Sequence, residues 1–375
     1  MNFTSPVDPN GLQEFSVVFT DRSLNHMSKS FQSIMLEIND TLKSVYSADH
    51  VALVPGGGTY GMEAVARQFA TDSKALVVRN GWFSYRWTQI FDACNLADHA
   101  EVMKASQTGN NQQSPFAPAA IETVVETIKQ QQPAAVFAPH VETSAGMILT
   151  DDYIKALADA AHSVGAIFIL DCIASGCIWI DMKALGVDIL ISAPQKGWSG
   201  TPCAGMVMMS ERAYTHMQET ESSSFAVNLK TWANIMKAYE NGGHAYHATM
   251  PTDGLRQMLD QMREMAEIGY EELKSRQQEL GDKVRAFLEA EGFTSVAADG
   301  FKAPGVVVSY TDRADFQNGS IFAANGAQIA AGVPLQCDEP EGFSTFRLGL
   351  FGLDKLKDVD GTLDRLKAVF AKVVG

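Results

Sequence analysis

An acid and a lysine stand at the ends of two apolar stretches of this sequence. Asp171 closes the apolar run 166–170, and Lys196 follows the mainly apolar run 187–191 after a short connection. Burying an unpaired charge costs free energy, so each of these residues should have a partner. A lysine in such surroundings loses its proton more readily, and its neutral amine can then form a Schiff base.

This pair of residues matches the needs of one cofactor, pyridoxal phosphate (PLP). PLP is linked to a lysine, and its ring nitrogen must stay protonated if the ring is to draw in electrons. A carboxylate at the end of a neighbouring strand could hold that proton, so Asp171 and Lys196 together indicate a PLP site. Each residue also has an ordinary explanation, because an Asp at a strand end often caps a helix and a Lys after a strand usually reaches solvent.

A glycine-rich stretch offers a second element of such a site. A strand expected at 51–54 is followed by Pro55-Gly56-Gly57-Gly58-Thr59 and by a helical pattern over 60–70. Backbone N–H groups at the start of a helix bind phosphate well. Tight turns between a strand and a helix also need glycine, so the stretch alone fits either explanation.

The elements that must position these residues follow from the periodicity of the apolar side chains. It predicts helices at 30–45, 60–70, 119–131 and 151–164, and strands at 51–54, 74–78, 134–138, 167–170, 189–191 and 204–209. Alternating strands and helices favour an α/β fold with a mainly parallel, doubly wound sheet. Ligands of such sheets bind beyond the carboxyl ends of the strands, where each stretch of interest stands.

The last third of the chain predicts a smaller α+β unit. It contains a long helical pattern from Thr252 towards Phe287, strands at 305–310 and 345–349, a helix near 320–331 and a final helix. The segment 106–118 reads as a surface loop. We therefore expect an N-terminal arm at 1–20, a large cofactor-binding domain at 21–255 and a small domain at 256–375.

The composition of the chain limits which binding partners and which cellular compartment we expect for it. A formal net charge of −15 argues against nucleic acid or an anionic membrane as a partner. No secretory signal or membrane span is visible, and five cysteines without paired spacing are typical of reduced thiols in the cytoplasm. His244 and His247 have no third ligand near them, so we expect no metal site.

Seven stretches in order give the chain a family resemblance. They are GGGTYGMEAV, NGWFSYR, HVETSAG, DCIASG, SAPQKG, YHATMP and FRLGLFG. From about His26 to the end, the chain resembles the class V aminotransferases, fold-type I PLP enzymes that include alanine–glyoxylate, serine–pyruvate and 2-aminoethylphosphonate transaminases. The resemblance implies an aminotransferase that moves an amino group from a small donor to a 2-oxo acid such as glyoxylate or pyruvate. It implies a ping-pong mechanism through Lys196.

The resemblance also implies roles for individual residues. Lys196 would carry the cofactor and move a proton, Asp171 would pair with the ring nitrogen, and Arg347 would bind the α-carboxylate of the substrate. The other implied cofactor contacts are Gly57, Gly58 and Thr59 at the phosphate, Phe83 on the ring face, Thr143 near the phenolic oxygen and Gln195 near the phosphate.

Two further residues imply a homodimer with shared active sites. Tyr246 and Thr249 resemble the residues that reach the phosphate from the partner subunit. The N-terminal Gly-Pro-x-Pro signature usual in this group is replaced by Ser5-Pro6-Val7-Asp8-Pro9, which weakens any inference about the substrate.

Alternatives stay open at this point. A lyase similar to cysteine desulfurases could use Cys337, although Gln195 stands where those enzymes carry a histidine before the lysine. A non-enzymatic protein with this fold is another possibility. A transaminase for a donor of the 2-aminoethylphosphonate or phosphoserine type is a further alternative. Arg22, His26, Tyr85, Arg86 and Trp198 could line a pocket for a second anionic group of the substrate, such as a phosphonate or carboxylate.

Overall fold

A seven-stranded sheet forms the centre of the computed structural model, which describes residues 7–374. In spatial order its strands are β1 (His50–Pro55), β11 (Ala204–Met209), β10 (Ile189–Ser192), β9 (Ile167–Asp171), β6 (Ala135–Pro139), β2 (Lys74–Arg79) and β3 (His99–Lys104). Strand β11 runs antiparallel to both of its neighbours, and the other strands are parallel to one another. The predicted mainly parallel sheet is confirmed.

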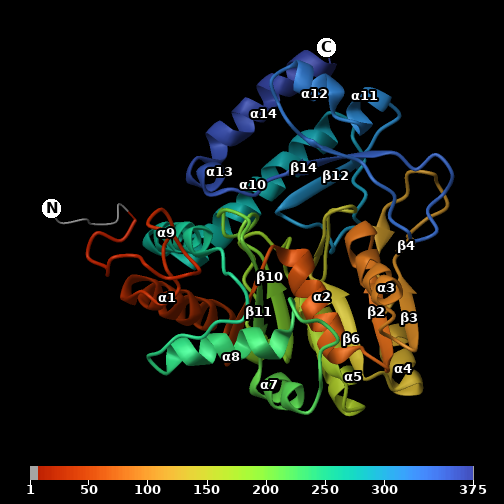
Figure 1. Cartoon of the computed structure of the whole chain (residues 1–375). Helices are drawn as coiled ribbons and strands as arrows, with labels where there is room; N and C mark the ends of the chain where they lie inside the picture. The colour runs from red at the N-terminus through yellow and green to blue at the C-terminus, as the bar shows by residue number, and fades with distance from the viewer. Residues whose placement is uncertain (1–6, 375) are drawn as a thin grey trace.

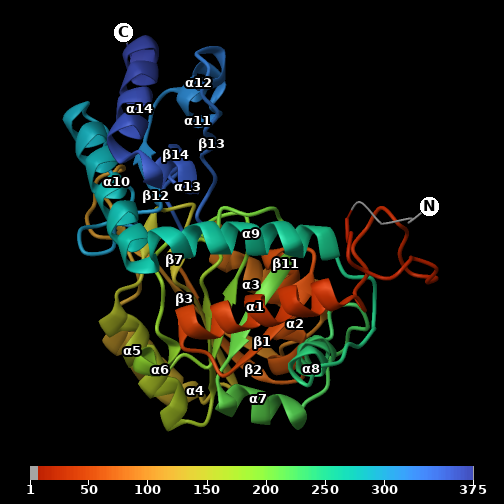
Figure 2. The same ribbon diagram turned by 90° about the vertical axis from the view of Figure 1, so that its left-hand side faces the viewer.

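Helices cover both faces of this sheet (Figures 1 and 2). On one face, α2 (Gly58–Phe69) packs against β11 and β10, and α3 (Trp82–Cys94) packs against β2 and β6. On the other face, α5 (Asp151–Ser163) packs against β9 and β6, with α4 (Ile121–Gln131) beside it. The remaining helices of this part are α1 (Lys29–Tyr46), α6 (Met182–Leu185), α7 (Glu211–Gln218) and α8 (Leu229–Glu240).

The central strands read as apolar runs because both of their faces are covered. Every residue of β6, β9, β10 and β11 is buried. Parallel strands between two layers of helices have no solvated face that would tolerate a charge. Asp171 is the last residue of β9, so the acid appears where the covered part of the strand ends.

A smaller unit lies beyond one edge of the large sheet (Figure 1). Its antiparallel sheet has the order β12 (Val306–Tyr310), β14 (Thr345–Gly349) and β13 (Ala330–Ala331). Helices α10 (Tyr270–Ala290) and α14 (Val359–Val374) pack on each other beside it. Short helices α11 (Ala314–Gln317), α12 (Ser320–Ala324) and α13 (Leu353–Lys357) complete the unit.

Three expected elements differ in the structure. The long helical pattern is broken at Gly269, whose φ of +98° favours glycine, into α9 (Thr252–Ile268) and α10. Helix α9 packs on α1. The helix expected at 320–331 is shorter, because α12 ends before Gly326 (φ +84°) and Ala330–Ala331 pair with β14. The expected loop 106–118 contains a small ladder of β4 (Ser106–Gln107) and β5 (Phe116–Ala117), and β7 (Val141–Glu142) pairs with β8 (Met147–Ile148).

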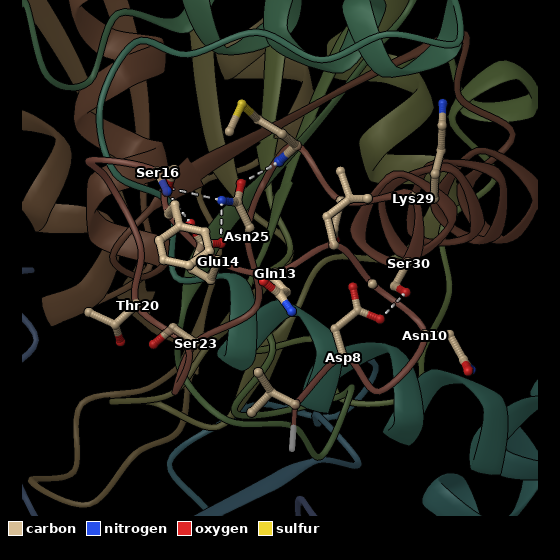
Figure 3. Close-up of a pocket in the computed structure, with 16 residues that line it drawn as sticks. Asp8, Asn10, Gln13, Glu14, Ser16, Thr20, Ser23, Asn25, Lys29 and Ser30 are labelled. Atoms are coloured by element: carbon tan, nitrogen blue, oxygen red, sulfur yellow. Dashed lines mark hydrogen bonds between the residues drawn. The ribbon is translucent and has the colours of Figure 1, made fainter. Parts of the chain in front are cut away.

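The N-terminal arm encloses a pocket of about 510 Å³ (Figure 3). All of its lining residues lie between Val7 and Ser30, so it contains none of the candidate site residues. The Glu14 carboxylate accepts hydrogen bonds from the Asn25 side chain (2.7 Å) and from the backbone of Ser16 (2.7 Å). The first six residues of the expected arm, including Ser5 and Pro6, lie outside the described residues. Within 7–374, none of the helices has the length and apolar character needed to cross a bilayer.

Gly205 provides a test of how closely α2 crosses the sheet. A Cβ atom at this position would lie 2.7 Å from the backbone nitrogen and 2.8 Å from the Cα atom of Gly61 in α2. Backbone atoms cannot move aside as a flexible side chain can, so we expect Gly205→Ala to destabilise the protein by about 1–3 kcal/mol. Denaturant unfolding measures this change.

Gly243→Ala is the matched control, because the atom nearest to its added Cβ is the Ala238 carbonyl oxygen at 3.4 Å. We expect it to change the free energy of unfolding by less than about 0.5 kcal/mol. Equal unfolding midpoints for the two variants would contradict the close crossing of α2 and β11.

Candidate active site

The ends of the parallel strands bring the candidate stretches to one edge of the sheet. Asp171 ends β9, Pro139 ends β6 directly before His140, and Arg79 ends β2 before the stretch that starts α3. Carboxyl ends of parallel strands share an edge, and ligands of α/β proteins bind there. In Figure 1 this edge faces the smaller unit that carries Arg347 on β14.

The ring of Phe83 is the centre of a cluster of cations. The Lys196 Nζ atom lies 5.7 Å from the ring centroid, and the Cζ atoms of Arg347 and Arg86 lie 5.6 Å and 5.1 Å from it. Lys196 is also 5.6 Å from the ring of Phe351. The structure therefore brings together the lysine, the aromatic ring and the small-unit arginine that the sequence singled out.

Burial shifts the pKa values of Asp171 and Lys196 in opposite directions. Burial raises the pKa of Asp171 to about 6, against a backbone hydrogen bond from Ile173 (2.9 Å) that favours ionisation. Burial also lowers the pKa of Lys196, and the nearby Arg347 acts in the same direction while Asp171 opposes it. In the described part of the chain neither the buried Asp171 nor the partly buried Lys196 has an ion-pair partner within 4 Å.

The glycine stretch forms the start of α2. Gly57 is the N-cap and is extended, and the first turn contains no acidic side chain. The first N–H groups of a helix have no acceptor within it, so they are available to an anion. A Cβ atom on Gly58 would lie 2.5 Å from the Ile173 side chain, which shows that this turn packs against the residues that follow Asp171. The Thr59 hydroxyl accepts a hydrogen bond from Arg86 Nη1 (3.0 Å).

Thr143 has an unsatisfied hydroxyl. Its side chain is buried, and its Oγ1 atom has no hydrogen-bond partner among the described residues. A buried polar atom without a partner costs free energy unless a ligand or water supplies one. Together with the free start of α2 and the uncompensated pair Asp171 and Lys196, this orphaned atom shows that the residues present fit PLP. Gln195, beside the lysine, is exposed.

Glu142 also lies in the site, although no role for it was predicted from the sequence. Its side chain is fully buried. Its Oε2 atom accepts hydrogen bonds from Ser84 N (2.8 Å) and Oγ (2.7 Å). Its Oε1 atom accepts them from Phe83 N (3.2 Å), Ser144 N (3.1 Å) and Ser144 Oγ (2.8 Å). The carboxylate thus binds the start of α3, where Phe83 lies. A role for Glu142 could have been predicted from its position, because it is an acid directly before Thr143 in a stretch that follows a buried strand.

Tyr246 and Thr249 lie apart from this cluster in the single chain. Their hydroxyls are 3.3 Å apart, and both residues are exposed. The Tyr246 ring packs near His26, with centroids 5.5 Å apart. Among the described residues they form no hydrogen bond with the other candidates.

Of the five residues considered for a second anion pocket, only Arg86 reaches the cluster. Trp198 is completely buried and donates to the Tyr46 hydroxyl (3.2 Å), so it cannot line an open pocket. His26 is also buried. The Tyr85 ring lies against the guanidinium of Arg79, and Arg22 is exposed on the arm.

Cys337 is a poor nucleophile in this structure. It is 4% exposed, its thiol donates to the Arg79 carbonyl (3.3 Å), and burial raises its pKa to about 12. A protonated, covered thiol does not suit the desulfurase alternative. All five cysteines are free, and residues 7–374 contain no group of three or more His, Cys, Asp or Glu side chains placed to hold a metal ion.

Comparisons with known proteins point to one family. The family model described as Aminotransferase class-V matches residues 12–340. The chain is 26% identical over 277 residues to alanine–glyoxylate aminotransferase 1 of Saccharomyces cerevisiae, covering 69% of each chain. It is 28% identical over 271 residues to the 2-aminoethylphosphonate–pyruvate transaminase of Vibrio vulnificus, covering 71% of this chain and 69% of the relative.

A solved structure shares the fold. It is the aspartate aminotransferase of subgroup IV from Thermus thermophilus, with a TM-score of 0.75, 22% identity, and coverage of 94% of this chain and 93% of the other. Because the family model spans most of the chain and the residues at the strand ends fit the cofactor, this protein belongs to the class V aminotransferase family and is a PLP-dependent aminotransferase of the fold-type I architecture.

Proposed function

We propose that this enzyme moves an amino group from a small amino donor to a short 2-oxo acid such as glyoxylate or pyruvate, in ping-pong order through Lys196. The observation that carries the proposal is that the partly buried Lys196 amine and the Arg347 guanidinium lie beside one aromatic ring. A carboxylate bound by Arg347 would place the α-carbon of an amino acid or oxo acid on the side of Lys196. The names of the two relatives, which mention glyoxylate and pyruvate, support these acceptors.

The residues that would hold the cofactor come from the ends of five strands, β1, β2, β6, β9 and β10. When bound, PLP supplies an aldehyde that takes up the amino group and a ring that draws electrons from the substrate α-carbon. Asp171 would keep the proton on the ring nitrogen, and Lys196 would provide the amine. Gly57, Gly58 and Thr59 at the start of α2 would bind the phosphate with Gln195 near them, Phe83 would face the ring, and the unpaired Thr143 hydroxyl would hydrogen-bond near the phenolic oxygen.

Lys196 performs the proton transfer in this proposal. A lysine can accept a proton from the α-carbon only when it is neutral, and the lowered pKa of Lys196 makes the neutral form more accessible. Arg347 orients the substrate for this step. Its Nε atom donates to the Ala331 carbonyl on β13 (2.7 Å), which fixes the guanidinium and leaves its outer N–H groups for a carboxylate.

The proposal includes a homodimer with shared active sites, in the cytoplasm. Tyr246 and Thr249 are exposed and hydrogen-bond mainly to each other, so their hydroxyls are available to the phosphate of a second subunit. A donor of the 2-aminoethylphosphonate or phosphoserine type is the second candidate, because Arg86 adds a cation to the cluster.

Covalent trapping tests the role of Lys196. Borohydride reduction of the PLP-loaded enzyme should fix the cofactor to Lys196, which peptide mass spectrometry identifies. Lys196→Ala should give no such adduct and should lower turnover by at least about 10³-fold, because no other amine is placed to move the proton. Lys183→Ala is the control, since Lys183 is an exposed lysine paired with Asp49 (2.8 Å). An adduct on any other lysine would sink the assignment.

Two buried aspartates should respond in opposite ways when their charge is removed from the cofactor-free protein. The folded-state pKa of Asp171, about 6, is above its ordinary value of 3.8, so its ionised form destabilises the fold above pH 6 and the penalty vanishes below about pH 4. Asp171→Asn should therefore stabilise the cofactor-free protein at pH 8, by about 1–3 kcal/mol, and leave it unchanged at pH 4. Denaturant unfolding at both pH values measures this.

Asp188→Asn is the matched control. Asp188 is equally buried, but it accepts from Arg212 (2.6 Å), His162 (2.9 Å) and the backbone of Phe168 (2.9 Å). Its substitution should destabilise the protein by about 3–5 kcal/mol. Destabilisation by both substitutions at pH 8 would mean that Asp171 already has a partner, contrary to its proposed role.

Arg347→Lys tests the carboxylate clamp in both halves of the reaction. When the donor is an amino acid, donor and acceptor each carry an α-carboxylate, so the loss of the bidentate guanidinium should raise KM for both by about 10–100-fold. The absorbance of the bound cofactor should not change. The two half-reactions are measured separately by that absorbance, with glyoxylate and pyruvate as acceptors.

Arg313→Lys serves as its control, because Arg313 is paired with Asp315 on the small unit (2.8 Å). A KM change confined to one half-reaction would argue against a shared clamp. Turnover with neither glyoxylate nor pyruvate would overturn the proposed acceptors while leaving the role of Lys196 intact.

A further inference from the structure

We propose that Arg86 is a positioning residue for the phosphate of the cofactor, and that it acts through Thr59. The inference rests on the proposed function, which places the phosphate at the start of α2. It assigns a role to a residue that the sequence analysis considered only for a second anionic group of the substrate.

The hydrogen bond between the two side chains has a fixed direction. Arg86 Nη1 lies 3.0 Å from Thr59 Oγ1. A guanidinium can only donate, so the threonine oxygen must accept. The single proton of the hydroxyl then cannot point at Arg86 and is left to donate to another acceptor. Arg86 therefore orients Thr59 as a donor at the point where the N–H groups of α2 emerge.

The guanidinium is held in place from two sides. Phe83 and Arg86 are three residues apart on α3, a spacing that puts side chains on one face of a helix. The Arg86 Cζ atom lies 5.1 Å from the centroid of the Phe83 ring, and Thr59 holds the outer end of the side chain. Glu142 in turn binds the first turn of α3, so the helix that carries Arg86 is itself held in place.

The positive charge of Arg86 and of the start of α2 suits a ligand group with two negative charges. Arg86 has no carboxylate within 4 Å among residues 7–374, and the first turn of α2 contains no acid. The start of a helix carries a partial positive charge, to which the guanidinium adds. A phosphate monoester, with two negative charges near neutral pH, is a better complement to this surface than a single carboxylate.

Other residues considered for a second anion pocket do not join Arg86 at the cluster. Trp198 and His26 are buried in separate contacts. Arg347 is fixed to β13 through the Ala331 carbonyl. Arg86 is therefore the one residue of that set at the cluster, and its nearest polar contact belongs to α2.

Binding of PLP and of pyridoxal, which lacks the phosphate, to the cofactor-free enzyme separates the two roles. Arg86→Gln should raise the Kd for PLP by about 10–100-fold, since a charge-assisted contact is lost, and should change the Kd for pyridoxal less than about threefold. Arg86→Lys should fall between, because it keeps the charge without the fork. Titrations followed by absorbance give both constants without turnover.

A double-mutant cycle tests whether the effect passes through Thr59. In a Thr59→Ala background, Arg86→Gln should raise the Kd for PLP much less than in the wild type, which shows coupling between the two residues. Arg67→Gln is the matched control on α2, because Arg67 pairs with Glu63 (2.8 Å) in the last turns of that helix. It should leave both Kd values unchanged.

Two results would overturn the inference. Equal weakening of PLP and pyridoxal by both Arg86 variants would show that Arg86 only maintains the fold. An unchanged Kd for PLP together with a KM increase limited to donors with a second anion would assign Arg86 to the substrate instead. Either result differs from a failure of the proposed function, which would appear as the absence of a trapped Lys196 adduct in the wild-type enzyme.

Discussion

The buried carboxylate of Glu142 connects two segments of the candidate active site by hydrogen bonds. It accepts hydrogen bonds from the first turn of α3 and from Ser144, two segments that adjoin different strands. The first N–H groups of a helix need acceptors, and water cannot reach these because Glu142 is fully buried. The same carboxylate thus fixes Phe83 on one side and the backbone beside Thr143 on the other.

The charges of the site are balanced only in part by the protein. Glu142 accepts five hydrogen bonds, whereas the buried Asp171 and the partly buried Lys196 have no ion-pair partner within 4 Å among the described residues. Such groups lower the stability of the folded chain, and a ligand that carries both a cationic ring and an anionic phosphate offsets this cost when it binds. Affinity for the cofactor and instability without it therefore arise from the same residues. This is a common consequence of a preorganised site.

The parts of the fold that were predicted from the sequence are those whose side chains face the core. Strands β6 and β9 are buried on both faces and appear as apolar runs. Strand β3 was not predicted, because none of its residues is buried and it lies at the edge of the sheet. Helix α3 was also missed: its N-cap is Gly81, which has no capping side chain, and its N–H groups are satisfied by Glu142 from a distant segment. Gly269 separates α9 from α10 without interrupting the apolar period.

Some site residues can be identified from their place in the sequence, and others only from their partners in space. Asp171 and Lys196 stand out because a charge next to an apolar run needs an explanation, and Arg347 because it lies in a stretch similar to the family's. The importance of Glu142 and Arg86 lies in their partners, Ser84 and Thr59, which become neighbours only when the strand ends converge. Both roles follow from contacts between segments that are distant in the sequence, so they could be assigned only once the structure showed these segments together.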